Sequence, residues 1–198
     1  MPVLFRLRFA VLNLLVPLLA SWLLVQLLDY SFYPHPLLDS KASLLYGPLS
    51  LTLKLPGTAA GIEEPLVAVG KPGVATLVYV RLLKDAHAKV GIEFWGFKAW
   101  ESSAFAVPSQ DARIKVDISF PALFPARDSS AWGWVSDTKK QYLLTHFSIA
   151  VNHVVQVNGT TPYVMPPDSP TYIGLNPLGG SFVSSAFTGT VLSSSRTF

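Results

Sequence analysis

The tryptophans give the most concentrated binding signal in this sequence. Four of the five lie in two short stretches, residues 94–100 and residues 132–134. Exposed aromatic rings can stack on sugars or anchor a protein interface, and tryptophan is enriched at binding hot spots. Burial in a hydrophobic core is the competing interpretation. The candidate interface or glycan residues are Trp95, Trp100, Trp132 and Trp134, of which Trp132 and Trp134 are expected to be an exposed pair on one strand face.

The acidic residues form no catalytic pattern. A glycosidase needs two carboxylates that face each other across a sugar bond. The four glutamates, Glu63, Glu64, Glu93 and Glu101, do not alternate along one strand in that way. The chain has no cysteine, so it has no thiolate nucleophile, and it carries no nucleophile elbow, P-loop or dinucleotide fingerprint. The sequence therefore predicts a protein that is not an enzyme and needs no cofactor.

Metal ligands are also not grouped along the chain. Asp128, Asp137 and Asp168 do not repeat at the spacing of a calcium loop and are typical of turns. The four histidines are far apart, and two of them alone do not make a zinc site. We expect no metal site.

The charge pattern argues against nucleic acid as a partner. Fifteen basic and twelve acidic residues give a net charge of +3, and the basic residues are scattered. A nucleic-acid interface needs clustered lysine and arginine. The sequence predicts no nucleic-acid partner.

An apolar run near the N-terminus predicts a membrane anchor. Residues 9–28 carry no charge, and a helix of about 20 residues spans the hydrocarbon core. Arg6 and Arg8 precede the run, so the positive-inside rule places the N-terminus in the cytoplasm and the rest on the periplasmic or extracellular side. A cleaved signal peptide is the alternative, although its apolar core would be shorter. Asn13 and Gln26 are candidates for contact with a neighbouring membrane helix, or for local hydrogen bonds.

The rest of the chain has the period of β-strands. We expect residues 1–30 to be the cytoplasmic start and membrane helix, residues 31–43 a proline-containing linker, and residues 44–198 an extracytoplasmic domain. Leucines at positions 49, 51, 53 and 55 alternate with polar residues, which indicates a half-buried antiparallel strand. Further strands are expected at residues 66–69, 75–83, 89–95, 113–120, 142–157, 171–175 and 187–192, with a hairpin turn at Asn158-Gly159. The fold class is all-β, a two-sheet antiparallel sandwich of the jelly-roll type with one N-terminal transmembrane helix.

The last third of the domain resembles a known superfamily. Its elements are Val157-Asn158-Gly159, Tyr172-Ile173-Gly174, Gly179-Gly180, and the run of Phe187, Gly189 and Val191. In this order they resemble the concanavalin A-like or laminin-G-like jelly rolls. The resemblance covers about fifty residues and implies a sandwich whose concave face or loop rim binds carbohydrate or protein.

Two functions remain open from the sequence. The first is a non-enzymatic, single-span accessory subunit of a membrane protein assembly, such as a respiratory or photosynthetic complex, that lies in the lipid bilayer and docks through its sandwich. The second is a membrane-anchored carbohydrate-binding module that uses the tryptophans. Purification in detergent with stoichiometric membrane partners, or binding to glycans, distinguishes them.

Overall fold

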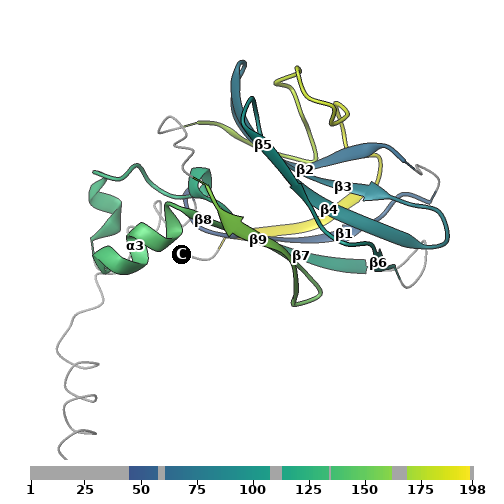
Figure 1. The fold of residues 1–198 in the computed structure, drawn as a ribbon, viewed down its shortest axis with the longest axis horizontal. Helices are drawn as coiled ribbons and strands as arrows, with labels where there is room; N and C mark the ends of the chain where they lie inside the picture. The colour runs from purple at the N-terminus through teal and green to yellow at the C-terminus, as the bar shows by residue number, and fades with distance from the viewer. Residues whose placement is uncertain (1–44, 58–60, 108–112, 134, 162–168, 197–198) are drawn as a thin grey trace, which may run out of the picture. The chain divides into compact units, whose positions relative to one another are not determined.

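Two antiparallel sheets packed face to face make up the computed structural model (Figure 1). The structure describes residues 45–57, 61–107, 113–133, 135–161 and 169–196, which all belong to one compact unit, Asp39–Phe198. The predicted all-β sandwich is confirmed for this part of the chain. The predicted membrane span, residues 9–28, lies outside it, and none of the helices within the described residues has the length and apolar character that a membrane crossing requires.

The five-stranded sheet has the order β11-β1-β7-β8-β9. Its strands are built on alternating apolar and polar residues, as the sequence predicts for Leu49 to Leu55. Leu51, Val116 and Ile149 are fully buried and point to the other sheet. The strands are β1 (Leu49–Lys54), β7 (Arg113–Ser119), β8 (His146–Val151), β9 (Val154–Thr160) and β11 (Thr190–Arg196).

The second sheet has the order β10-β2-β3-β4-β5, with β6 pairing β4 beside β5. Its strands β2 and β3 are apolar on both faces, because one face packs on the core and the other is covered from outside. The strands are β2 (Glu63–Lys71), β3 (Val74–Leu82), β4 (His87–Phe94), β5 (Lys98–Glu101), β6 (Phe105–Ala106) and β10 (Thr171–Ile173).

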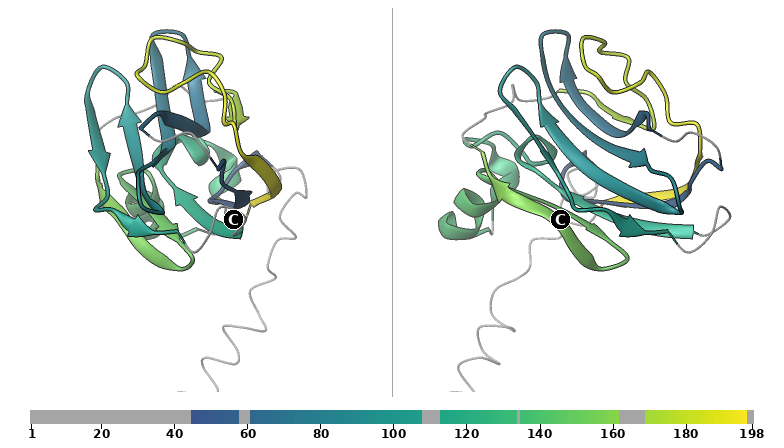
Figure 2. Two further views of the ribbon diagram at one scale, coloured as in Figure 1. Left: turned by 90° about the vertical axis from the view of Figure 1, so that its right-hand side faces the viewer. Right: turned by 45° about the vertical axis from the view of Figure 1, so that its right-hand side comes forward.

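The covering segment is the loop of residues 176–186, which we call the C-terminal flap. Figure 2 shows it in yellow beside the blue β2–β3 hairpin. Leu178 and Val183 of the flap are buried against Ala68, Leu77 and Tyr79, which form a second apolar cluster outside the main core. The flap therefore converts the outer side of the six-stranded sheet into a second interior.

Two sequence predictions about turns and ends are wrong. The hairpin turns at Asn152-His153, where both residues have positive φ, while Asn158 and Gly159 lie inside β9. Asparagine tolerates this conformation without glycine, so the stronger Asn-Gly signal misleads. The strand predicted at 187–192 begins only at Thr190 and continues to Arg196 at the edge of the five-stranded sheet.

The single strand predicted over 142–157 is wrong: its first two residues end the short helix α3 (Asp137–Leu143), and the rest forms the hairpin of β8 and β9. The Ser136 hydroxyl accepts a hydrogen bond from the Lys139 backbone N–H at 3.3 Å and caps the helix. Two 3₁₀ turns, η1 (Pro121–Leu123) and η2 (Ser130–Trp132), connect β7 to this helix.

Candidate functional site

The outer side of the five-stranded sheet carries mainly small, uncharged side chains. Each apolar residue that points into the core alternates with a small residue that points outward, so the pattern of the strands determines this surface. Serine is the commonest residue on it. We call this surface the five-stranded face; its small residues are Ser50, Thr52, Ser119, Ser148, Ala150, Val155, Asn158, Ser193 and Ser195.

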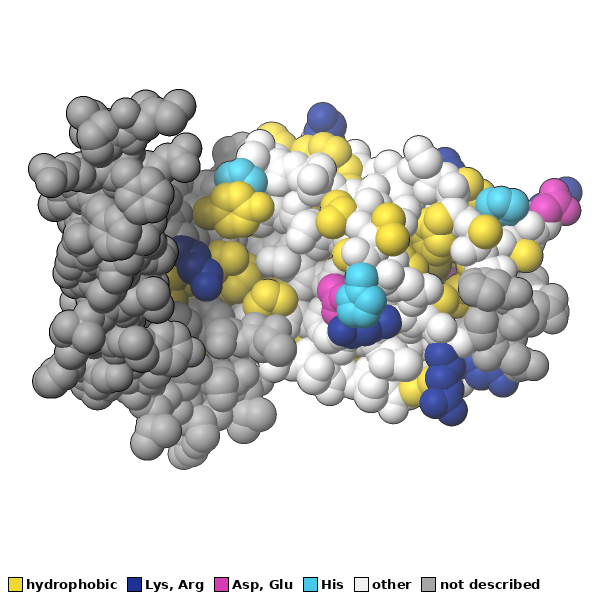
Figure 3. Space-filling view, turned by 90° about the horizontal axis from the view of Figure 1, so that it is seen from below, with side chains coloured by type: hydrophobic (Ala, Val, Ile, Leu, Met, Phe, Trp, Pro, Cys, Tyr) yellow, Lys and Arg dark blue, Asp and Glu magenta, His cyan; other side chains and the backbone are white. Residues whose placement is uncertain are grey.

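One charged cluster lies in the middle of the five-stranded face. Asp117 accepts a hydrogen bond from the Ser50 hydroxyl at 2.6 Å, and Lys115 Nζ lies 3.5 Å from the same carboxylate. His153 Nδ1 lies 3.7 Å from its other oxygen. Figure 3 looks at the molecule from below and shows charged side chains in only a few places on this side. The charges of this cluster offset one another. The other lysine and arginine that point outward from the strands of this face, Lys54 and Arg113, lie opposite each other where β1 ends and β7 begins.

Exposed apolar side chains border this face at β9 and α3. Val154 and Val155 are 61% and 57% exposed at the start of β9. Tyr142 of α3 stacks on His146 of β8, with ring centroids 3.9 Å apart. Short side chains have few rotamers, so covering this face by another protein would cost little side-chain entropy.

The tryptophans do not form the exposed surface that the sequence predicts. Trp132 is 4% exposed, its Nε1 donates to the Ala126 carbonyl at 2.8 Å, and its ring stacks on Phe124. The prediction that Trp132 is exposed is therefore wrong, because η2 turns its ring inward. Its intended partner, Trp134, lies outside the described residues, as do Asn13 and Gln26.

Trp95 and Trp100 are each half-buried, in two different places. Trp100 packs in the main core against Phe94 and Phe147, with ring centroids 5.5 and 5.0 Å away. Trp95 lies beneath the C-terminal flap, so close to Gly180 that a Cβ there would overlap its ring. The described tryptophans therefore stabilise the domain at three separate points and do not share one binding surface.

A charged network lies on the outer side of the six-stranded sheet, beside the flap. Arg81 binds Glu63 and Glu101, and Lys89 Nζ lies 2.9 Å from the Glu101 carboxylate. Glu93 accepts from the Ser181 hydroxyl of the flap. These glutamates are far apart in the sequence and form no pattern there, but cross-strand register brings Glu63, Glu93 and Glu101 onto one face.

Tyr79 lies at the centre of this side and is nearly completely buried. Its ring covers Gly91 on the next strand, and Phe182 of the flap contacts it edge-on at 5.4 Å. Burial raises the pKa of Tyr79 to about 12, and the nearby Glu101 carboxylate adds to this effect while Arg81 opposes it. The hydroxyl is therefore neutral over the whole physiological pH range.

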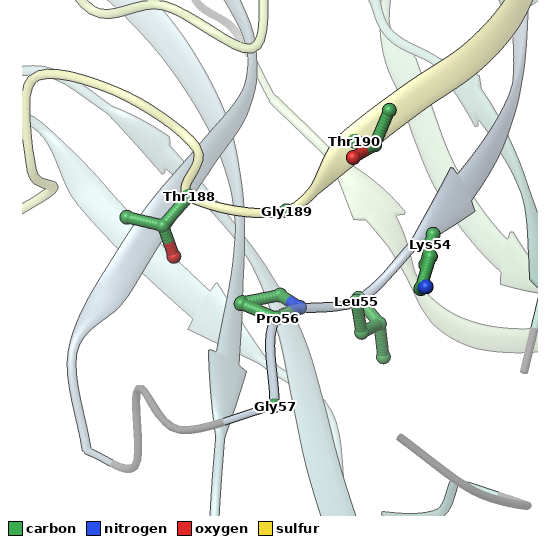
Figure 4. A pocket seen from close by; sticks show the side chains of 7 residues that line it. All are labelled: Lys54, Leu55, Pro56, Gly57, Thr188, Gly189 and Thr190. Atoms are coloured by element: carbon green, nitrogen blue, oxygen red, sulfur yellow. The ribbon is translucent and has the colours of Figure 1, made fainter. Parts of the chain in front are cut away.

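A shallow polar pocket lies where β1 ends and β11 begins (Figure 4). Its volume is about 320 Å³, and Lys54, Pro56, Thr188 and Thr190 are among the lining residues. The buried Glu64 accepts bonds from the Thr188 backbone N–H and hydroxyl, both at 2.8 Å. Because both carboxylate oxygens are used to hold this loop, we interpret the pocket as part of the framework.

The acidic and histidine side chains of the described residues are spread over the domain. They contain no group of three or more histidine, aspartate or glutamate side chains placed to hold a metal ion. The described glutamates instead bind arginine, lysine, serine or threonine.

No protein-family model matches the chain, and no curated protein matches it.

Proposed function

We propose that this protein is a non-enzymatic, single-span accessory subunit of a membrane protein assembly, which docks on its partners through the five-stranded face. The uncharged run of residues 9–28 would anchor it in the bilayer with the N-terminus in the cytoplasm. The sandwich would then meet the partner subunits on the periplasmic or extracellular side.

The observation that carries the proposal is the composition of the five-stranded face. Serine, threonine, alanine and valine lose little conformational entropy on binding, whereas a long charged side chain loses up to about 2 kcal/mol. The face also requires limited desolvation of charge, since its outward charges are the Asp117 cluster and, where β1 ends and β7 begins, Lys54 and Arg113.

Purification of the full chain in mild detergent tests the proposal. We expect partner subunits to co-purify in stoichiometric amounts with the wild type. Ser148→Arg places a long charge on the five-stranded face, in register with Ser119 and Asn158, and should reduce partner recovery roughly tenfold. Ser103→Arg, at an exposed serine outside this face, is the matched control and should leave recovery unchanged. Equal recovery with both variants would contradict docking at this face.

The anchor would contribute through its two polar positions. Asn13→Leu with Gln26→Leu removes any interhelical hydrogen bonds, each expected to contribute about 0.6–2 kcal/mol. We expect partner recovery to fall less than with Ser148→Arg. If the helix variant alone abolishes recovery, the helix is the main docking element.

A membrane-anchored carbohydrate-binding module is the second candidate, and one observation favours it. Phe182 is 53% exposed and lies against Tyr79, on the side of the sheet that carries Glu93 and Glu101. An aromatic ring near carboxylates can stack on a sugar and accept its hydroxyl bonds. We also propose that the domain belongs to the jelly-roll superfamily that its C-terminal third resembles. The two antiparallel sheets support this proposal.

A glycan array separates the two candidates. Binding that is lost in Phe182→Ala but kept in Phe97→Ala, at a phenylalanine that is 57% exposed elsewhere, would favour the carbohydrate module. No glycan binding, together with co-purified subunits, favours the accessory subunit.

A further inference from the structure

Two hairpin turns project side by side from one end of the six-stranded sheet. The first is Lys71-Pro72-Gly73-Val74, which joins β2 to β3, and the second is Trp95-Gly96-Phe97-Lys98, which joins β4 to β5. Both views of Figure 2 show the two hairpins, in blue and teal, at the same end of the sheet. The Trp95 backbone N–H donates to the Ala75 carbonyl at 2.9 Å, which holds the second turn against the first. We call these eight residues the hairpin tips.

The hairpin tips expose apolar side chains on an ordered backbone. Phe97 is 57% exposed and Val74 is 37% exposed. The Phe97 N–H donates to the Phe94 carbonyl at 2.9 Å, and Gly96 between them has a φ of 77°, so a hydrogen-bonded turn fixes the position of Phe97. Gly73 has a φ of 91° in the other turn. Turns that are already ordered lose little entropy when they bind.

The charge of the hairpin tips is entirely positive. Lys71 and Lys98 are both exposed, and the eight residues include no aspartate or glutamate. The nearest acidic residue along β4, Glu93, accepts a hydrogen bond from the C-terminal flap. At the opposite end of the sheet, the turn between β3 and β4 holds Lys84 together with Asp85. Lysine beside an exposed apolar side chain is the combination that an anionic lipid surface attracts, and each lysine there raises binding about fivefold.

The chain enters the domain near the base of these hairpins. Arg196 donates to the Gly47 carbonyl at 3.3 Å and to the Thr171 hydroxyl at 3.1 Å. Thr171 pairs with Val69, two residues before Lys71. The start of the described chain and the hairpin tips therefore belong to the same end of the sandwich.

We propose that the hairpin tips contact the surface of the membrane that holds the anchor, and that they favour a bilayer with anionic headgroups. Phe97 and Val74 enter the headgroup region, and Lys71 and Lys98 lie against its negative charge. The proposal rests on the proposed membrane anchor, because the sixteen residues 29–44 reach at most about 55 Å when fully extended. An anchored chain thus holds the hairpin tips within reach of the bilayer, where a weak contact is populated by high effective concentration.

A fluorescent probe on a single introduced cysteine tests the contact, since the natural chain has no cysteine. The full chain with Val74→Cys carries an environment-sensitive fluorophore and is reconstituted in vesicles of phosphatidylcholine and phosphatidylglycerol, to which nitroxide-labelled lipid is added. Lys84→Cys, in the exposed turn at the opposite end of the sheet, is the matched labelling site. We expect the nitroxide lipid to quench the probe at Val74→Cys roughly threefold more strongly than at Lys84→Cys. Equal quenching at the two sites would overturn the proposal.

Two sets of substitutions in the Val74→Cys chain separate lipid contact from tethering alone. Phe97→Asp should lower the quenching roughly fivefold, whereas Ile62→Asp, at an apolar residue that is 52% exposed at the opposite end of the sheet, should not. Lys71→Gln with Lys98→Gln should lower it about fivefold or more in these anionic vesicles and leave it unchanged in vesicles of phosphatidylcholine alone. Quenching that none of these substitutions at the hairpin tips reduces would contradict a specific contact.

Flotation of the vesicles distinguishes failure of this proposal from failure of the anchor. A chain that floats with vesicles of phosphatidylcholine alone is anchored, and absence of quenching at Val74→Cys then overturns the tip contact and leaves the anchor standing. A chain that floats only with anionic vesicles supports the tip contact and contradicts the anchor. A chain that floats with neither contradicts both. A probe that is shielded only when partner subunits are added would assign the hairpin tips to a protein and overturn the lipid contact.

Discussion

The two outer faces of this sandwich differ because their strands follow different patterns: the five-stranded sheet alternates apolar and polar residues, whereas β2 and β3 are apolar on both faces. The five-stranded face is uncovered within the described residues, small and largely neutral. The six-stranded sheet carries apolar residues outward at Ala68, Leu77 and Tyr79, and the C-terminal flap covers them. The ion pairs of Arg81 with Glu63 and of Lys89 with Glu101 lie on the same face, next to Tyr79. A sheet face is available for binding only where no segment of the same chain packs on it.

The two faces also differ in how much space their side chains have. The Tyr79 ring covers Gly91, and the Trp95 ring lies against Gly180. A side chain at either glycine would overlap the ring, so close packing requires glycine at both positions. On the five-stranded face the small side chains point outward, and no described segment of the chain packs on them. We therefore expect substitutions to cost stability on the six-stranded side and to cost binding on the five-stranded side.

Removal of β11 should have the largest effect on this comparison. A chain that ends at Ala186 lacks the strand that pairs β1 along Leu49–Lys54. The exposed β1 edge and the opened core should make the protein aggregate. Size-exclusion chromatography of the truncated chain checks this. A truncated protein that elutes like the wild type and melts at the same temperature would show that β11 is dispensable.

Gly91→Ala should come next. The added methyl group would overlap the Tyr79 ring, so the ring and Phe182 above it must move. We expect a loss of about 1–3 kcal/mol in the free energy of unfolding, by analogy with overpacked cores. Ser148→Ala on the five-stranded face is the control and should change stability by less than about 0.5 kcal/mol. Chemical denaturation measures both, and similar losses would remove the contrast between the two faces.

Tyr79→Phe should have a smaller effect that depends on pH. The pKa of Tyr79 is raised to about 12 in the folded protein, against about 10 when unfolded, so the folded state resists loss of the phenolic proton. Stability from this group is complete below pH 10 and is lost as the pH rises from 10 to 12. We expect the wild type to lose about 1–2 kcal/mol more than Tyr79→Phe across this interval, allowing for solvent screening near the partly exposed carboxylates. Parallel curves of melting temperature against pH would contradict this assignment.

Glu101→Gln should have the smallest effect. It weakens the contacts with Arg81 and Lys89, whose side chains are partly exposed, so we expect a loss of less than about 1 kcal/mol. High salt should reduce the difference from wild type. Denaturation at low and high ionic strength provides the measurement, and a difference that grows with salt would exclude a simple ion-pair contribution.

The sequence by itself determined the class of the domain and the faces of its simplest strands. Alternation at Leu49 to Leu55 and from Ile114 to Ile118 is local information, because neighbouring side chains of a strand point to opposite sides. The absence of charge on β9 and the small residues of the five-stranded face could also be read from the sequence once those strands were placed.

The tertiary structure alone decided which residues meet and which are covered. Trp132 turns inward because η2 and Phe124 receive its ring, and Glu63, Glu93 and Glu101 share a face only through cross-strand register. The hairpin uses Asn152-His153 because pairing of β8 with β9, and not turn propensity alone, fixes where the chain reverses. These properties depend on contacts between residues distant in sequence, which composition and periodicity do not encode.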